Sequence, residues 1–247
     1  MTIATLAPAY IEPSRLADAV KNHGFGVLSP TGLAAFLDTP LSAFDAIKPG
    51  WNDLPADHFL KDGGRYRRRR HSCFIVEQTR VGQVPHRAHY QPPQYNALHG
   101  GMLRMFEPIT PHTIAQPAWS TLLLSLAQAC SDVKGARPWY VEAHQFRIDT
   151  RNGIGRPTPE GAHRDGVDFV AILLVARVHV SGGESRIFEA VGPHGQRFTL
   201  GEAWTLLLLD DQRVLHESTP IRPTAAGGHR DTLVLTFRSG GFLEQNA

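Results

Sequence analysis

The chain has 247 residues, which is enough to bury a substantial core as one large domain or two small ones. Hydrophobic residues make up 42% of it and charged residues 19%, proportions that are typical of an ordinary globular protein. The formal net charge of +2 provides no strong general field for nucleic acid or for an acidic membrane surface. We therefore expect neither a nucleic-acid partner nor a membrane partner. The composition does not determine the oligomeric state.

The cysteines and the N-terminus bear on the cellular compartment. Cys73 and Cys130 lie far apart and form no Cys-x-x-Cys motif, so neither a disulfide framework nor a cysteine zinc site is indicated. The first residues lack the basic and apolar segments of a signal peptide, and no apolar run reaches the ~18 residues needed to cross a bilayer. These features predict a cytoplasmic protein with reduced cysteines.

In the first half of the chain, three segments have the apolar spacing and the proline or glycine boundaries of helices. They span residues 13–24, 29–47 and 117–133. The middle segment is interrupted by Pro40 and is expected to form two short helices. Between these segments, residues 66–78 predict a strand, and the Pro- and Gly-rich residues 89–101 predict a loop.

From about residue 139 onward, the pattern changes to short strands separated by turn residues. The predicted strands span residues 139–148, 167–180, 185–191, 196–200, 203–209, 213–221 and 230–238. Short strands at this spacing are typical of a β-sandwich or jelly roll. We predict a single α+β domain over residues 1–247, with helical and loop support over about 1–135 and a sheet core over about 136–240.

A His-x-Asp pair at His163 and Asp165 is the first candidate metal motif. In a strand, residues two apart point to the same side, so both side chains could reach one ion. His216, in a later predicted strand, is the best candidate for a third ligand. Two histidines and one carboxylate on one face of an octahedral ion form the metal site of non-haem Fe(II) oxygenases, which leaves positions open for a 2-oxo acid and O2.

The same chemistry requires a cation for the far carboxylate of 2-oxoglutarate, which a guanidinium binds in a bidentate manner. Arg230 lies 14 residues after His216, across a turn and at the start of the last strand, so a hairpin could return it to the metal. Arg238 is the alternative anchor. His229 and Asp231 flank Arg230 in a second His-Arg-Asp triplet and are expected to point away from the metal.

The order of these features resembles the Fe(II)/2-oxoglutarate-dependent dioxygenases. More narrowly, it resembles the bacterial family that includes L-isoleucine dioxygenase and the biofilm-stress-motility proteins. The likeness extends over almost the whole chain and rests on the segments YRRRRHSCF, HYQPPQYN, GGMLRMFEPI, VEAHQFRI, EGAHRDGVDF, GGES and LHESTPI. The resemblance implies a double-stranded β-helix (jelly-roll) core, Fe(II), the cosubstrates 2-oxoglutarate and O2, and hydroxylation of a small polar substrate, more weakly a free L-amino acid.

Two residues of the strand at 139–148 are candidates for cosubstrate and substrate binding. Gln145 and Arg147 share one face of that strand, and His144 lies on the other. We expect the Gln145 and Arg147 face to point inward, where Gln145 would contact 2-oxoglutarate and Arg147 the substrate. If the strand is turned the other way, His144 replaces them.

Other polar residues lie outside this strand. Tyr90, Gln91 and Asn96 lie in the predicted loop and are candidate substrate contacts, since loops on a rigid scaffold often carry binding residues. An ordinary irregular loop is the alternative. The run of four arginines at residues 67–70 splits two to each face of a strand, which is no continuous stripe for nucleic acid. A solvated edge strand is one interpretation of this run, and a single inward arginine holding a substrate carboxylate is another.

Two further functions compete with the oxygenase. A site of two histidines and one aspartate could bind zinc in a hydrolase, but no His-Glu-x-x-His motif or evident general base accompanies it. A non-catalytic or sensory relative could bind a metal or a small ligand in stress, motility or biofilm signalling. The intact triad together with Arg230 favours the enzyme, with no catalytic residue beyond the metal site.

Overall fold

One large antiparallel sheet forms the centre of the computed structural model, which describes residues 6–96 and 98–245. Its seven strands are, in spatial order, β1 (Phe25–Leu28), β9 (Leu206–Asp210), β5 (Phe169–Val178), β12 (His229–Arg238), β4 (Trp139–Asp149), β2 (Arg67–Glu77) and β3 (Arg80–Gln83). Two small antiparallel sheets complete the strand inventory of this region. One contains β10 (Val214–Ser218), β7 (Ser185–Glu189) and β8 (Gly195–Phe198), and the other β11 (Ile221–Pro223) and β6 (Val180–Gly182).

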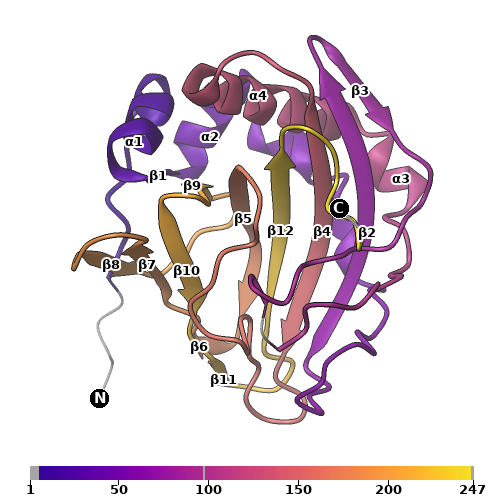
Figure 1. Ribbon diagram of the computed structural model, residues 1–247. Coiled ribbons are helices and arrows are strands. Elements are labelled where there is room, and N and C mark those ends of the chain that lie inside the picture. The colour runs from indigo at the N-terminus through magenta and orange to yellow at the C-terminus, as the bar shows by residue number, and fades with distance from the viewer. Residues whose placement is uncertain (1–5, 97, 246–247) are drawn as a thin grey trace.

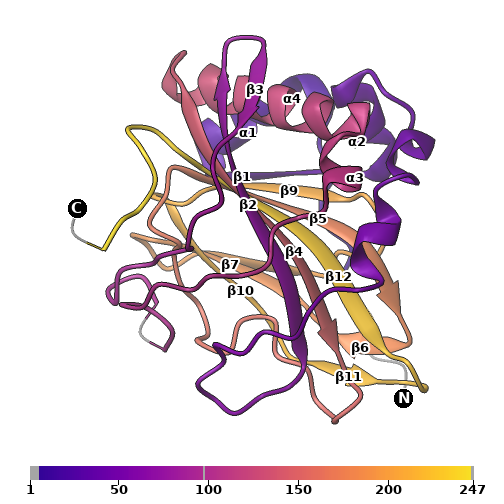
Figure 2. The same cartoon turned by 90° about the vertical axis from the view of Figure 1, so that its right-hand side faces the viewer.

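The helices lie together on one side of the large sheet, and the small sheet of β7, β8 and β10 lies on the other (Figures 1 and 2). The helices are α1 (Leu16–His23), α2 (Pro30–Leu37), α3 (Pro111–Ile114) and α4 (Pro117–Lys134), with short 3-10 turns at Pro13–Arg15, Leu41–Phe44 and Lys48–Trp51. None of the helices within residues 6–96 and 98–245 is long and apolar enough to cross a membrane.

Helix α4 confirms the prediction for residues 117–133. Proline is tolerated at its first position because the amide there has no partner within the helix. The helix buries Trp119, Leu122 and Leu126 in the main hydrophobic core, together with apolar residues of the large sheet. The core between helices and sheet thus fixes the orientation of the sheet, and with it the face that is left for a site.

The predicted strands are confirmed, with three differences. The segment at 213–221 is divided, because β10 ends at Ser218 and Ile221 begins the separate strand β11. The segment at 167–180 is divided, because His179 adopts a left-handed conformation (φ 47°) and the chain turns from β5 into β6 there. The first half of the chain also supplies three strands of the large sheet rather than support alone. The short apolar strand β1 pairs with β9, and β2 pairs with β4, so the sheet extends across the boundary expected near residue 135.

Alternation along β4 sorts its side chains into two sets. Val141 and Ala143 are fully buried in the core beneath the helices. Glu142 and His144 point to the opposite face, where a pocket opens between the large sheet and the small sheets. The neighbouring strand β12 follows the same alternation, since it pairs with β4 in continuous antiparallel register along its whole length.

An ion pair fastens β4 to β12 on the face opposite the pocket. Arg147 Nε and Nη2 donate to the two carboxylate oxygens of Asp231, at 2.8 and 2.7 Å. The Asp231 side chain is only 3% exposed. We expect Asp231→Asn to lower the free energy of unfolding by about 1–3 kcal/mol, since a partly buried guanidinium loses its charged bidentate partner. Denaturant unfolding would measure this change. Loss of bound metal without loss of stability would contradict a structural role for Asp231.

Candidate functional site

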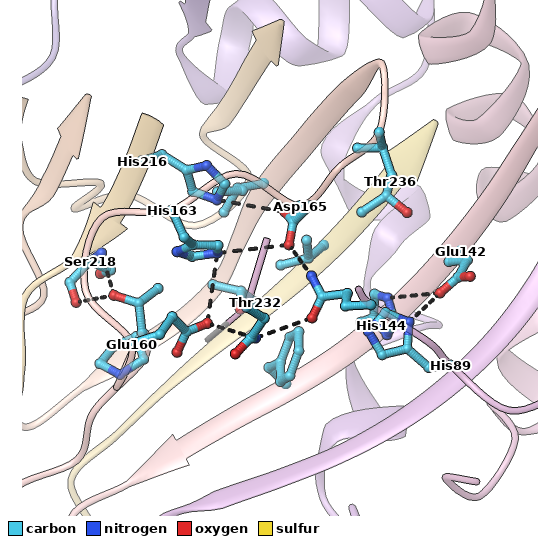
Figure 3. Close-up of a pocket in the computed structure, with 18 of the residues that line it drawn as sticks. His89, Glu142, His144, Glu160, His163, Asp165, His216, Ser218, Thr232 and Thr236 are labelled. Atoms are coloured by element: carbon cyan, nitrogen blue, oxygen red, sulfur yellow. Dashed lines mark hydrogen bonds and ion pairs between the residues drawn. The ribbon is translucent and has the colours of Figure 1, made fainter. Parts of the chain in front are cut away.

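Three side chains with metal-binding atoms converge on the pocket side of the sheet. The imidazole Nε2 of His163 lies 3.7 Å from one carboxylate oxygen of Asp165, and Nε2 of His216 lies 3.8 Å from the other. The candidate ligand atoms of the three residues all lie within 4.8 Å of one another. Figure 3 shows the two imidazoles and the carboxylate pointing toward a common point. The structure therefore brings together the three residues predicted as metal ligands.

The local backbone differs from the expected strand. Only His216 lies in a strand, β10, whereas His163 and Asp165 lie in an irregular segment between β4 and β5. His163 joins β10 through a single bridge, with mutual backbone hydrogen bonds to His216 of 3.1 and 2.9 Å. The side chains meet because of this bridge and the turn after it, not because of alternation within one strand.

The bonding of both histidines fits a metal ion. His163 Nδ1 donates to the carbonyl oxygen of Gly161 at 2.9 Å, so the neutral ring carries its proton there and leaves Nε2 free to coordinate. Burial lowers the pKa of His163, but Asp165 and Glu160 outweigh that effect and raise it. Burial, and next the charge of His163, lower the pKa of His216 to about 3, so His216 is the ring of the pair that stays in the neutral, metal-binding form. The donor set of two imidazoles and one carboxylate is one that suits Fe(II).

Asp165 is held from two sides by residues outside the predicted motif. The buried carboxylate of Asp211 accepts the backbone N–H groups of Asp165, Gly166 and Val167, at 2.9, 2.8 and 3.0 Å. On the other side, Gln91 Nε2 donates to a carboxylate oxygen of Asp165 at 2.7 Å. These contacts fix both the backbone and the side chain of the candidate ligand.

Arg230 lines the same pocket and is 5% exposed. No acidic side chain within residues 6–96 and 98–245 forms an ion pair or a hydrogen bond with its guanidinium, and its Nε has no partner there. Burial, and next the charge of Arg177, lower the pKa of Arg230 to about 10, so it stays charged at neutral pH. A buried cation without an acid is costly, and an anionic ligand would relieve that cost.

The alternative anchor, Arg238, also lines the pocket, but its guanidinium already donates a hydrogen bond to the backbone. Its Nη1 donates to the carbonyl oxygen of Gly241 at 2.6 Å. Arg238 and Arg230 stand at opposite ends of β12, so a single small anion cannot reach both. His229 and Asp231 lie on the face opposite Arg230, where Asp231 binds Arg147.

The expected inward face of β4 is wrong. His144 lines the pocket, whereas Gln145 is completely buried on the helix side and Arg147 is paired with Asp231 on that same face. A Cβ on Gly50 would lie 2.8 Å from the amide nitrogen of Gln145, which shows how closely the 3-10 turn at Lys48–Trp51 covers this residue. Neither Gln145 nor Arg147 is therefore placed to contact cosubstrate or substrate.

The three candidate residues of the 89–101 loop all line the pocket. Tyr90 contributes its ring to the wall, and Gln91 contacts Asp165 as described. Asn96 Nδ2 donates to Gln91 Oε1 at 3.2 Å and to Glu160 Oε1 at 3.4 Å. Gln91 thus acts on the metal ligand rather than standing free for a substrate.

The arginine run alternates as predicted. Arg67 and Arg69 are buried on the pocket side, while Arg68 and Arg70 are partly exposed on the other. Arg67 Nε pairs with Asp57 at 2.7 Å. Arg69 lies between the rings of two phenylalanines, 3.8 Å from the centroid of Phe106 and 4.4 Å from that of Phe146. The interpretation as a solvated edge strand is therefore wrong, because Arg67 and Arg69 both point into the pocket.

A second group of metal-binding side chains was missed by the sequence argument. His71, His89, Glu142 and His144 offer ligand atoms within 4.8 Å of one another. Glu142 Oε2 lies 2.5 Å from His89 Nδ1 and 3.2 Å from His71 Nε2. Burial raises the pKa of this carboxyl, but His89 and His71 outweigh that effect and hold it below its ordinary value. Figure 3 shows His89, Glu142 and His144 at one end of the pocket, away from Glu160 and Ser218.

The hydrogen bonding of this group favours a network over a second metal centre. Nη2 of Arg69 lies 2.7 Å from His144 Nδ1, and a guanidinium can only donate. His144 therefore accepts at Nδ1 and carries its proton on Nε2, the atom that would have to bind a metal. The sequence contains one signal for this group: Glu142 and His144 are two residues apart in a predicted strand and so point to the same side.

Comparisons with known proteins give the following matches. A sequence model described as 2OG-Fe dioxygenase matches residues 48–236. The curated proteins contain no match. Among solved structures, a bsmA homolog from Methylobium petroleophilum PM1 is 50% identical with a TM-score of 0.91, covering 99% of this chain and 100% of that chain.

Two more distant structures are similar in fold alone. One, IDO from Bacillus thuringiensis, is 18% identical with a TM-score of 0.75, and the match covers 93% of this chain and 100% of that one. The other, an Fe(II)/(alpha)ketoglutarate-dependent dioxygenase named TqaL, is 18% identical with a TM-score of 0.70 over 92% of this chain and 86% of that one.

The geometry predicts which His-Arg-Asp triplet holds a metal. His163→Ala should remove stoichiometric Fe(II) while the apoprotein stays folded, because a core of this size does not depend on one ion. His229→Ala is the matched control, since His229 lies on the opposite face of β12 and should leave the iron content near one per chain. Metal analysis and circular dichroism would measure both. Loss of iron in the control, with retention in His163→Ala, would identify the wrong triplet.

Proposed function

Since the chain belongs to the 2OG-Fe dioxygenase family, we propose that it is an Fe(II)- and 2-oxoglutarate-dependent dioxygenase that hydroxylates a free L-amino acid. Members of this family use Fe(II), 2-oxoglutarate and O2. The observation that carries the proposal is the presence, in one pocket, of the donor triad and of a buried guanidinium that has no acidic partner among the described residues.

In this proposal His163, Asp165 and His216 hold Fe(II). The tautomer of His163, the neutral ring of His216 and the two-sided fixation of Asp165 support the assignment. When bound, the iron supplies the activation of O2 that is coupled to conversion of 2-oxoglutarate to succinate and CO2. The protein holds the ligands in place, and Asp211 keeps the backbone of Asp165 from shifting when a cosubstrate arrives.

Arg230 binds the distal carboxylate of 2-oxoglutarate in this proposal. Its burial removes competing water, which strengthens a charged bidentate pair. Phe146 and Ile148 of β4 line the same pocket, and their apolar side chains reduce the access of water to it.

The remaining parts of the proposal concern the subfamily and the fold. Similarity to the bsmA homolog over nearly the whole chain supports a place in the bacterial group that contains L-isoleucine dioxygenase and the biofilm-stress-motility proteins. We take the large sheet and the facing sheet of β7, β8 and β10 to be the two halves of a jelly roll within one domain. A place in that bacterial group would support a free amino acid as the substrate.

Turnover of 2-oxoglutarate tests the enzyme against the sensory alternative. With anaerobically loaded Fe(II), exposure to O2 in the presence of single L-amino acids should produce succinate, and at least one amino acid should raise the rate above the background. Asp165→Ala should abolish both the visible charge-transfer band of the anaerobic Fe(II)–2-oxoglutarate complex and the turnover. A protein that binds Fe(II) and 2-oxoglutarate and forms the band, but never forms succinate on exposure to O2, would favour the sensory alternative.

The anchor is tested by comparing two arginines of one strand. Arg230→Ala should raise the concentration of 2-oxoglutarate needed for half-maximal band formation on the order of a hundredfold, because a buried carboxylate loses its charged partner. Arg238→Ala is the matched control and should leave that concentration within about threefold of wild type. Iron content should be unchanged in both. The reverse pattern would place the anchor at the other end of β12.

A further inference from the structure

A second buried guanidinium in the pocket, that of Arg104, has no acidic partner in the part of the chain that the structure describes. The residue is 2% exposed and lines the pocket. Its backbone is fixed by a bridge to His89, with mutual hydrogen bonds of 3.0 and 2.9 Å. Its Nη2 donates to Gln91 Oε1 at 2.9 Å. No acidic side chain in residues 6–96 and 98–245 forms an ion pair with it, and its Nε has no hydrogen-bond partner there.

The other pocket arginines at this end of the site are compensated. Arg67 is paired with Asp57. Arg69 is stacked between two aromatic rings, bonds to His144 and lies 3.9 Å from the carboxylate of Asp57. Arg104 is therefore the arginine of this region that forms no direct ion pair with any acid of the described residues, although Asp57, Glu160 and Glu142 act on it from a longer distance. Burial, and next the charge of Arg67, lower its pKa to about 10, which still leaves it protonated at neutral pH.

Arg104 lies close to the candidate metal site. Gln91 is the link, since its Oε1 accepts from Arg104 at 2.9 Å and its Nε2 donates to Asp165 at 2.7 Å. Because the two ends of a carboxamide are about 2.3 Å apart, the guanidinium nitrogen is at most about 8 Å from the carboxylate of Asp165. A molecule anchored at Arg104 by one end needs only a few carbon atoms to present a C–H bond beside the metal.

We propose that Arg104 binds a carboxylate of the substrate, so that the substrate is a small molecule with a free carboxylate group. This inference rests on the proposed function, because it takes the triad as the reaction centre. It assigns the two buried arginines of the pocket that pair with no acid among the described residues to two different anions, Arg230 to the cosubstrate and Arg104 to the substrate. One interpretation of the arginine run at residues 67–70 is that an inward arginine holds the substrate carboxylate. The proposal gives this role to Arg104, which lies in the loop after β3.

Equilibrium binding to the wild-type protein tests whether the substrate needs a free carboxylate. Proteinogenic L-amino acids and their carboxamides are added under anaerobic conditions to protein loaded with Fe(II) and 2-oxoglutarate, and binding is followed by the shift in melting temperature. The carboxamide retains the size and the amine but removes the anion. At least one acid should bind, and its carboxamide should bind at least tenfold more weakly. Equal affinities, or no binding by any acid of the panel, would overturn the proposal.

The variant Arg104→Gln should weaken binding of that acid on the order of a hundredfold and leave binding of the carboxamide unchanged. Arg80→Gln is the matched control, since Arg80 is exposed on β3 and its loss removes the same charge far from the pocket. Unchanged affinity for the acid in Arg104→Gln would overturn the proposal. If this variant does not fold, Arg104→Lys takes its place in the same comparison, since lysine keeps the charge but loses the bidentate guanidinium, and it should also weaken binding of the acid more than binding of the carboxamide.

Two further outcomes separate this inference from neighbouring explanations. If Arg104→Gln abolished the charge-transfer band of the Fe(II)–2-oxoglutarate complex, Arg104 would act by positioning Asp165 through Gln91, and the proposal would be overturned. If the wild-type protein gave no such band but bound an acid through Arg104, the proposed function would fail while the assignment of Arg104 would stand.

Discussion

The antiparallel register of β4 and β12 is the constraint on which the site depends. It turns Arg230 and His144 toward the pocket and Asp231 and Gln145 toward the opposite face. A slip of β12 by one residue would turn its pocket-facing side chains toward the helices and place Asp231 where Arg230 lies now. The pairing of β12 with β5 has an irregularity between Asp231 and Thr232, whereas the pairing of β12 with β4 is continuous. The irregularity therefore leaves the register between β12 and β4 unchanged. One register thus serves both the core under the helices and the chemistry of the other face.

Burial of charge connects that register to function. Most buried ionisable groups around the pocket are satisfied within the chain: Arg67 by Asp57, and Glu142 by the imidazoles of His71 and His89. Such groups are stable without any ligand. Arg230 and Arg104 are different, because neither meets an acid within the described residues. Their unbalanced charge is the feature that distinguishes a binding site from a polar interior.

Local sequence patterns predicted the elements well, because α4 and the later strands are strongly periodic. The metal-binding triad could also be predicted from the sequence, because a His-x-Asp pair, a later histidine and an arginine at the start of the last strand occur in the order that the chemistry requires. The inward face of β4 was predicted wrongly, although Val141 and Ala143 share the face of Gln145 and mark it as the core side. Asp211 and Arg104 could not be found from the sequence. Their contacts join segments far apart in the chain, and no local pattern records such pairings.

Gln91 gives the pocket an internal order that neither cation could impose alone. A guanidinium is only a donor, so Arg104 requires the oxygen of the Gln91 amide to face it, and Asn96 donates to that same oxygen. The amide nitrogen is then directed at Asp165, where it donates to the carboxylate. A flipped amide would set donors against donors on one side and acceptors against acceptors on the other. The loop that carries Gln91 therefore does more than line the pocket. Through Gln91 it joins Arg104 to Asp165, so that the proposed site for the substrate carboxylate and the proposed metal site are held in a fixed geometry relative to each other.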